Sequence, residues 1–355
     1  MTGTSRASRQ RAMGYSYRGP KAALIASTPP LNSCPRKEKS NFASVAGASW
    51  LGMDPDPALT HLYSCSRWAD ADPAEVIAEY IRIGEETCRE LRLLTHIEDL
   101  AYEDDGYRGK DSRSMVDIWG EVKDHLVIFI HGGFWQVGVG LQKFLISQLI
   151  LFYVQIPNVT LLFAGFSDGD VADFAILVAV NLVKSGVAMA AVGYELASST
   201  WPLSAVVRQV GRAVEVGFYF TIRLLLIPRI QFLLAKYPTV TYITLAGHSA
   251  GAQLAFKAYT HLRSPRIQKL ALLAGIFDLQ ELPSCEIGTI IGLTREEAEL
   301  NSCSAFELVN TEVKVLLLID MKDSPKLIEQ NTCMVNAMKD AGVSVQYHVL
   351  STLDI

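Results

Sequence analysis

Residues 241–251 constrain the fold of this chain more than any other stretch. An apolar, β-branched run, T-Y-I-T-L-A, leads there into G-H-S-A-G, and helix-forming residues follow. A strand that turns this sharply into a helix needs small residues on both sides of the turn, because side chains at Gly247 and Gly251 would collide with neighbouring backbone. Ser249 stands at the strained apex of the turn, which presents its hydroxyl to an electrophile. The pattern predicts a nucleophilic serine between a strand and a helix.

Apolar runs alternate with helix-like stretches on both sides of this turn. The run H-L-V-I-F-I at 125–130 is typical of a central parallel strand that is buried on both faces. Strands that alternate with helices predict an α/β fold with a mostly parallel, doubly wound sheet flanked by helices. Further strands are predicted over 187–192, 270–274, 313–319 and 343–350, and helices over 72–93, 171–184, 203–216 and 326–341.

Charge divides the chain into a basic leader and an acidic body. Half of the 355 residues are hydrophobic, which is enough to bury a large core. Residues 1–53 carry eight Lys and Arg against one acidic residue, which leaves 24 basic and 36 acidic residues for the rest. The body therefore has the wrong charge for a nucleic-acid partner. We predict a disordered leader over 1–52, with a transit peptide as the alternative, and a single domain over 53–355.

Cysteine usage and apolar segments bear on the compartment. The six cysteines are scattered without metal-ligand spacing, which favours free thiols in the cytoplasm; a mitochondrial location is the alternative. Residues 144–167 carry no charged side chain over 24 positions, a length that could span a bilayer. Pro157 in the middle, several polar side chains and a position between two motifs of one predicted site argue against a membrane span. The apolar run at 218–227, which Arg223 interrupts, is predicted to be a buried or inserted helix.

A serine nucleophile needs donors for the developing oxyanion, a base, and an acid that orients the base. The amide of Ala250, directly after the serine, is one predicted donor. The other donors are predicted in a glycine-rich turn at the end of the strand over 125–130, with His131 as a structural anchor of that turn. The turn reads His131-Gly132-Gly133-Phe134-Trp135, and its predicted donors are Gly132, Gly133 and Phe134.

The acid is expected in the loop after a late strand. Two aspartates follow the apolar run at 315–319 in the sequence D-M-K-D-S-P. Asp323 is the preferred acid, because it lies further out on the loop, where a carboxylate can reach a histidine. Asp320 is the alternative, and its position close to the strand suits it to shaping the turn.

Six motifs follow one another in order between residues 60 and 354. They are Y-S-C-S-R-W at 63–68, H-G-G-F-W-Q at 131–136, G-Y-E-L at 193–196, G-H-S-A-G-A at 247–252, G-I-F-D-L at 275–279 and D-S-P at 323–325. This set resembles that of the kynurenine formamidases, or arylformamidases, of the α/β-hydrolase superfamily. The aromatic residues of the H-G-G-F-W turn, in place of the H-G-G-G of lipase-like esterases, make the resemblance fairly specific.

The resemblance implies an α/β-hydrolase fold and hydrolysis of N-formyl-L-kynurenine to L-kynurenine and formate in tryptophan catabolism. It implies Ser249 as the nucleophile and Asp323 as the acid, and it requires no metal or organic cofactor. The expected partner is a small aromatic formamide. Phe134 and Trp135 either flank this substrate or pack under the turn. The sequence leaves the oligomeric state open, a homodimer included.

The chain departs from that family's pattern in two places. The family carries its catalytic histidine after the last strand, in a D-H-F-type step before a C-terminal helix, whereas here Asp354 is followed by Ile355 and the helix is missing. His348 is a weak substitute within a predicted strand, and His248 points away from its neighbour Ser249. The second departure is an apolar insertion at about 139–169, which is either unspliced sequence or a lid.

Three functions follow from these departures. The chain is an impaired kynurenine formamidase, a general carboxylesterase of the same fold, or a catalytically inactive, hydrolase-like binding protein. Loss of one member of a catalytic triad lowers the rate by several orders of magnitude, which is why the missing histidine matters.

Overall fold

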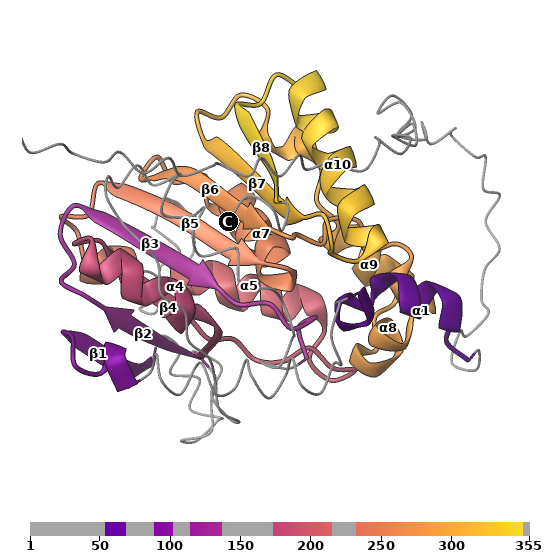
Figure 1. Ribbon diagram of the computed structural model, residues 1–355, viewed down its shortest axis with the longest axis horizontal. Helices are drawn as coiled ribbons and strands as arrows, with labels where there is room; N and C mark the ends of the chain where they lie inside the picture. Colours follow the sequence, from indigo (N-terminus) through magenta and orange to yellow (C-terminus); the bar gives the residue numbers. More distant parts are fainter. Residues whose placement is uncertain (1–53, 69–88, 102–113, 137–172, 215–231, 351–355) are drawn as a thin grey trace, which may run out of the picture. The chain divides into compact units, whose positions relative to one another are not determined.

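A computed structural model describes residues 54–68, 89–101, 114–136, 173–214 and 232–350 (Figure 1). Eight strands in these ranges form one sheet in the order β1-β2-β4-β3-β5-β6-β7-β8. The strands are β1 (His96–Ala101), β2 (Met115–Trp119), β3 (His125–Ile130), β4 (Ala188–Val192), β5 (Tyr242–His248), β6 (Ile267–Leu273), β7 (Lys314–Asp320) and β8 (Val345–Leu350).

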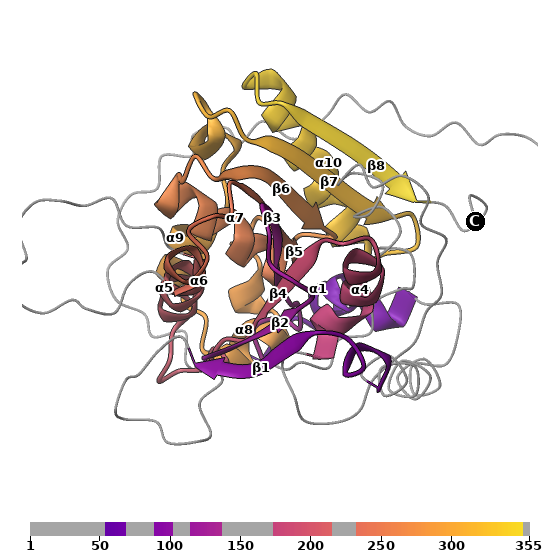
Figure 2. The same ribbon diagram turned by 90° about the vertical axis from the view of Figure 1, so that its left-hand side faces the viewer.

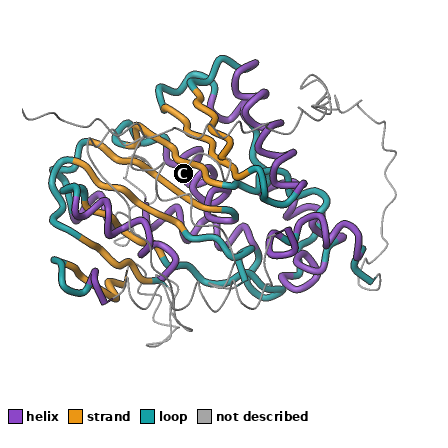
Figure 3. Tube along the Cα trace, in the orientation of Figure 1, coloured by secondary structure: helices purple, strands orange, loops and turns teal. Residues whose placement is uncertain are grey.

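Helices connect most of these strands, as the colouring by secondary structure in Figure 3 makes plain. The α-helices are α1 (Pro57–Tyr63), α4 (Asp173–Lys184), α5 (Leu203–Val214), α6 (Phe232–Lys236), α7 (Ala250–Leu262), α8 (Glu286–Ile291), α9 (Arg295–Asn301) and α10 (Pro325–Asp340). The short 3-10 helices are η1 (Cys65–Trp68), η2 (Leu282–Ser284) and η3 (Ala305–Leu308).

The prediction of a mostly parallel, doubly wound sheet is confirmed. Strands β4, β3, β5, β6, β7 and β8 pair in parallel, whereas β2 pairs antiparallel with both β4 and β1. Because the central strands are parallel, the residues that follow β3, β5 and β7 leave the sheet at the same edge. This edge receives all the predicted site residues, and Figure 1 shows α1 and α8 beyond it.

Two hydrophobic cores lie on the two faces of the sheet, because successive side chains of a strand point to opposite faces. Leu126 and Ile128 of β3 join a core to which α5, α7 and α10 contribute. Val127 and Phe129 of the same strand join a second core with residues of α4. Figure 2 shows α4 and α5 on opposite sides of the sheet. The continuous apolar run of β3 is therefore explained by burial on both faces.

Most of the predicted elements are present, with ends that differ by a few residues. The helix predicted over 203–216 is α5, and the one predicted over 326–341 is α10. The pair β1 and β2 and the short helices α1, α8 and α9 were not predicted. No helix in the described part of the chain is long and apolar enough to cross a membrane.

Several predictions concern residues outside the described ranges. They are most of the helix over 72–93, the apolar segment 144–167 with the insertion at about 139–169, the run at 218–227, the leader over 1–52, and Asp354 with Ile355. The division into a leader and one domain therefore stays a prediction.

Candidate active site

The turn after β5 has the geometry that its sequence predicts. Ser249 lies between the end of β5 and the start of α7, with φ 54° and ψ −119°, a region that residues with a Cβ rarely occupy. A Cβ on Gly247 would lie 2.1 Å from the carbonyl oxygen of Gly251. A Cβ on Gly251 would lie 2.1 Å from the carbonyl oxygen of Ile130, at the end of β3. Both glycines are therefore required by close backbone approach.

The glycine-rich turn after β3 lies directly against this serine. A Cβ on Gly132 would come within 2.9 Å of the carbonyl oxygen of His248 and 3.0 Å of the Cβ of Ser249. The backbone of the turn is unusual, because Gly133, Phe134 and Trp135 have φ values of 96°, 48° and 59°. Three successive left-handed residues curl the chain tightly beside the elbow. The structure thus brings the predicted donor turn and the predicted nucleophile together.

The amides predicted to stabilise an oxyanion are available for that task. Ala250 is the first residue of α7, and its N–H has no acceptor within the helix. The N–H groups of Gly133 and Phe134 donate no hydrogen bond to another residue of the described ranges. The amide of Ser249, in contrast, donates to the carbonyl oxygen of Leu273 at 2.8 Å and ties the elbow to β6.

Trp135 anchors the turn to helix α7. Its side chain is fully buried, and its Nε1–H donates to Oε1 of Gln253 on α7 at 3.1 Å. The amide of Gln253 continues this chain of bonds to the carbonyl oxygen of Asn301 at 2.9 Å. Phe134 is partly buried and packs against the same core. Of the two roles left open by the sequence, these contacts favour packing over substrate contact for Trp135.

A role that sequence reasoning missed belongs to Tyr194 in the G-Y-E-L motif after β4. Its hydroxyl lies 3.0 Å from the carbonyl oxygen of His131 and 3.1 Å from that of Gly132, and its one hydrogen is shared between them. Its ring stacks on the His131 ring, with centroids 4.2 Å apart and planes 6° from parallel. Two signals were available, namely its place in the G-Y-E-L motif and its position directly after a buried strand that ends at the same sheet edge.

Both candidate acids lie buried at the end of β7. Asp320 accepts a hydrogen bond from the amide of Lys322 at 2.7 Å, and Asp323 accepts one from the amide of Ser324 at 2.7 Å. Their exposed fractions are 5% and 8%. Ser324 then caps α10 by accepting from the amide of Leu327 at 3.3 Å. The two aspartates are buried to a similar extent and both accept from backbone, so the structure does not choose between them as the acid.

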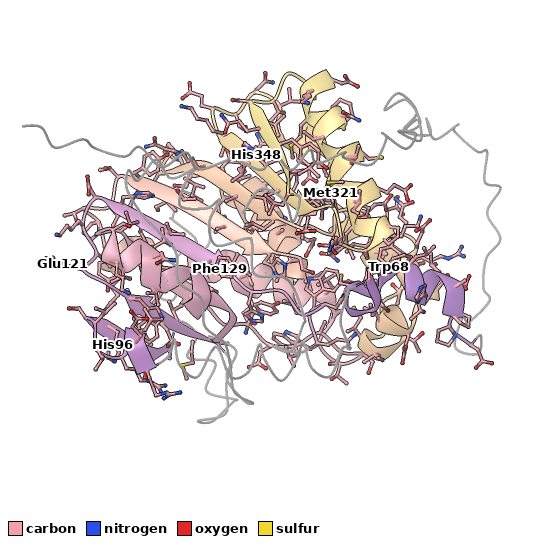
Figure 4. The ribbon with its side chains drawn as sticks, viewed as in Figure 1. Trp68, His96, Glu121, Phe129, Met321 and His348 are labelled. Atoms are coloured by element: carbon pink, nitrogen blue, oxygen red, sulfur yellow. The ribbon has the colours of Figure 1, made fainter. Side chains whose placement is uncertain are left out.

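No histidine is bonded to the serine. The chain has seven histidines, and all of them fall in the described ranges. Within these ranges no side chain forms a hydrogen bond with the hydroxyl of Ser249. His348 lies inside β8 opposite Leu318, and Figure 4 shows it along that strand, apart from Met321 at the end of β7. Among the residues that the structure describes, no histidine is bonded to the predicted nucleophile.

His248 makes stability depend on pH. Its Nε2 is buried and has no hydrogen-bond partner among the described residues, and burial lowers the pKa of the ring from 6.5 to about 4. The unfolded chain therefore takes up the proton more readily than the folded chain does. The contribution of His248 to the free energy of unfolding should therefore fall by about 3 kcal/mol as the pH drops from about 6.5 to about 4.

Replacement of His248 by glutamine should make this part of the stability profile less steep, and the slope that remains includes His125, whose pKa is lowered by burial to about 4. The measurement is the free energy of unfolding in urea between pH 7 and pH 4.5. His61→Gln, which removes an exposed histidine, is the matched control and should retain the wild-type slope. An unchanged slope in the His248 variant would contradict the expectation.

The described part of the chain contains no group of three or more His, Cys, Asp or Glu side chains placed to hold a metal ion.

Comparison with known proteins gives the same picture. No family model matches the sequence. A protein named kynurenine formamidase from Danio rerio is 25% identical over 322 residues, which cover 86% of this chain and 91% of that protein. The protein of the same name from Salmo salar is 25% identical over 305 residues, covering 82% and 85%.

The fold comparison is independent of those relatives. A solved structure from Silicibacter sp. TM1040, provisionally classed as a thioesterase, aligns with a TM-score of 0.56 and 18% identity. The alignment covers 82% of this chain and 90% of that one. The chain therefore has the α/β-hydrolase fold and is similar over most of its length to kynurenine formamidases.

Proposed function

We propose that this chain is a slow serine hydrolase of aryl formamides, with N-formyl-L-kynurenine as its substrate. The observation that carries the proposal is the close approach of two motifs, in which a Cβ on Gly132 would lie only 3.0 Å from the Cβ of Ser249 at the strained elbow. The names of the relatives add the substrate class. The proposal assigns attack to Ser249 and donation to the oxyanion to the amides of Gly132, Gly133, Phe134 and Ala250.

The reaction has two halves. The Ser249 hydroxyl oxygen forms a bond to the formyl carbon while a base takes the hydroxyl proton, and the carbonyl oxygen becomes an oxyanion. The carbon–nitrogen bond then breaks, and the arylamine leaves with a proton returned by the base. Water attacks the formyl ester in the second half, which releases formate and restores the serine.

The proposed slow rate rests on the described residues, none of which places a histidine against Ser249. A neutral serine hydroxyl is a weak nucleophile, and a buried aspartate such as Asp323 acts only by orienting a histidine. With no histidine bonded to Ser249, the remaining catalysis would come from the oxyanion donors and from substrate binding. Such residual catalysis is on the order of 10³–10⁴-fold over water in other serine hydrolases.

Imidazole supplied in solution should act as the base that Ser249 lacks among the described residues. We expect the release of L-kynurenine from N-formyl-L-kynurenine, followed by its absorbance, to rise at least about tenfold with increasing imidazole, since general-base catalysis contributes about 10²–10⁴-fold. N-methylimidazole is a matched probe of the same chemistry. The background reaction of imidazole with the substrate, measured without protein, is subtracted.

Each other outcome selects a different function. Hydrolysis of nitrophenyl acetate without cleavage of N-formyl-L-kynurenine would replace the proposal by a general carboxylesterase. Absence of both reactions, with binding of the formamide retained in calorimetry, would indicate a hydrolase-like binding protein. Fast cleavage without imidazole would show that a base other than a bonded histidine serves Ser249.

A further inference from the structure

In the glycine-rich turn at 131–135, side chains bond to the carbonyl oxygens of two peptide groups but not to their N–H groups. The Tyr194 hydroxyl shares its one hydrogen between the carbonyl oxygens of His131 and Gly132, which lie 3.0 and 3.1 Å from its oxygen. His131 reaches the second of these oxygens as well, because its Nδ1 lies 2.8 Å from the carbonyl oxygen of Gly132. A carbonyl oxygen can only accept, so Nδ1 of His131 carries the hydrogen in this contact.

Because a peptide group is planar, the bonds to these two carbonyl oxygens also fix the direction of the N–H groups of the same peptides. In a trans peptide the N–H points opposite to the C=O, and the chain contains no cis peptide bond among its described residues. The oxygen of His131 shares a peptide with the N–H of Gly132, and the oxygen of Gly132 shares one with the N–H of Gly133. Both N–H groups are therefore held pointing away from Tyr194.

The N–H groups of these peptides lie on the side of the turn that approaches Ser249. A Cβ on Gly132 would lie 3.0 Å from the Cβ of Ser249, and the amide of Gly133 has no acceptor in the described ranges. Gly133 has a φ of 96°, a conformation that glycine adopts freely and from which a peptide can flip at little cost. A turn of this kind needs an external restraint if its amides are to point in one direction.

Tyr194 is itself rigidly held. The amide of Gly193 donates to the carbonyl oxygen of Met115 on β2 at 2.9 Å, and the amide of Glu195 donates to Oε1 of Gln209 on α5 at 2.7 Å. The amide of Ala197 donates to the carbonyl oxygen of Trp135 at 2.7 Å, which ties the two segments together again. Tyr194 is fully buried, and burial raises the pKa of its hydroxyl, so this group remains a donor at neutral pH.

We propose that Tyr194 is a positioning residue, which fixes the N–H groups of Gly132 and Gly133 as oxyanion donors beside Ser249. This inference rests on the proposed attack by Ser249, but not on the identity of the substrate. Tyr194 touches neither the substrate nor the reacting atoms. Its effect should therefore fall on the rate of the chemical step and spare ground-state binding.

The variant Tyr194→Phe removes the hydroxyl and keeps the ring that stacks on His131. The readout is the rate at which a fluorophosphonate labels Ser249 in the presence of imidazole, as the oxygen–phosphorus bond forms, fluoride leaves and imidazole takes the proton. We expect the rate to fall about tenfold or more, and less than the ~10²–10³-fold loss on deletion of a donor itself. KM for an aryl ester should change less than twofold.

Tyr347→Phe is the matched control, because it removes a half-buried tyrosine hydroxyl that lies 3.3 Å from Oγ1 of Thr332, away from the turn. Its labelling rate should stay at the wild-type value. A crystal structure of Tyr194→Phe is the second measurement, and the Gly132–Gly133 peptide should be flipped or present in two orientations. An unchanged peptide together with an unchanged labelling rate would overturn the proposal.

The two proposals can fail separately. Labelling that slows in Tyr194→Phe, without cleavage of N-formyl-L-kynurenine by the wild type, keeps the role of Tyr194 and rejects the formamide substrate. Formamide cleavage that is equally fast in Tyr194→Phe keeps the substrate and rejects the role. If the wild type is not labelled at all, the orientation of the peptide in the variant decides.

Discussion

Replacement of Ser249 by alanine is expected to abolish covalent labelling by a fluorophosphonate and to remove the whole imidazole-dependent part of the hydrolysis rate. Ser249 lies at the elbow with a φ of 54°, and no other Ser, Thr or Tyr among the described residues has a positive φ. Loss of the attacking serine in other hydrolases lowers kcat about 10⁶-fold when the triad is intact. Without imidazole, the loss should be far smaller, since serine and base act as a unit.

These two expectations distinguish a serine that reacts once a base is supplied from a site that has no reactive serine. Mass spectrometry of the labelled protein locates the adduct, and titration with imidazole gives the dependent part of the rate. Ser185→Ala, which removes a part-buried hydroxyl that bonds to the carbonyl oxygen of Asn181, is the matched control and should label like the wild type. Labelling that persists in Ser249→Ala would place the reactive group elsewhere and reject the proposed mechanism.

The central strands could be predicted because burial on both faces leaves a plain signal in the sequence. The runs that became β3 and β5 are mostly apolar, and their lengths suit strands better than helices. β1 carries no such signal, because H-I-E-D-L-A at the edge of the sheet mixes charged and apolar residues. The short helix α9 depends on a local cap, in which Thr294 accepts from the amide of Glu297, and its seven residues show no clear period.

The site divides in the same way between local and distant information. The elbow is local, since Gly247, Ser249 and Gly251 act within five residues of one another. The contacts of Tyr194 with Gly132 and of Trp135 with Gln253 join residues 62 and 118 positions apart. Pairing at such distances is set by the order of strands in the sheet, which a single sequence does not specify. The motifs could therefore be found in the sequence, but the hydrogen bonds that join them could not be predicted from it.

The substitution Gly251→Ala should destabilise the fold and the site together. An alanine Cβ there would lie 2.1 Å from the carbonyl oxygen of Ile130 and 2.3 Å from that of His131. Both atoms belong to backbone at the end of β3, so no flexible side chain can move aside. We expect a loss of at least about 3 kcal/mol in the free energy of unfolding, the upper end of ordinary overpacking.

Gly211→Ala is the matched control, because it adds the same methyl group inside helix α5. No described atom lies within 4 Å of the Cβ that it would create. Alanine is the better helix former by up to about 1 kcal/mol, so this variant should be as stable as the wild type or more so. Urea unfolding of both variants gives the comparison, and equal stabilities would refute the close approach of α7 to β3. Labelling of Ser249 should also slow in the surviving folded fraction of Gly251→Ala, because any relief of the clash moves the turn at His131 away from the elbow.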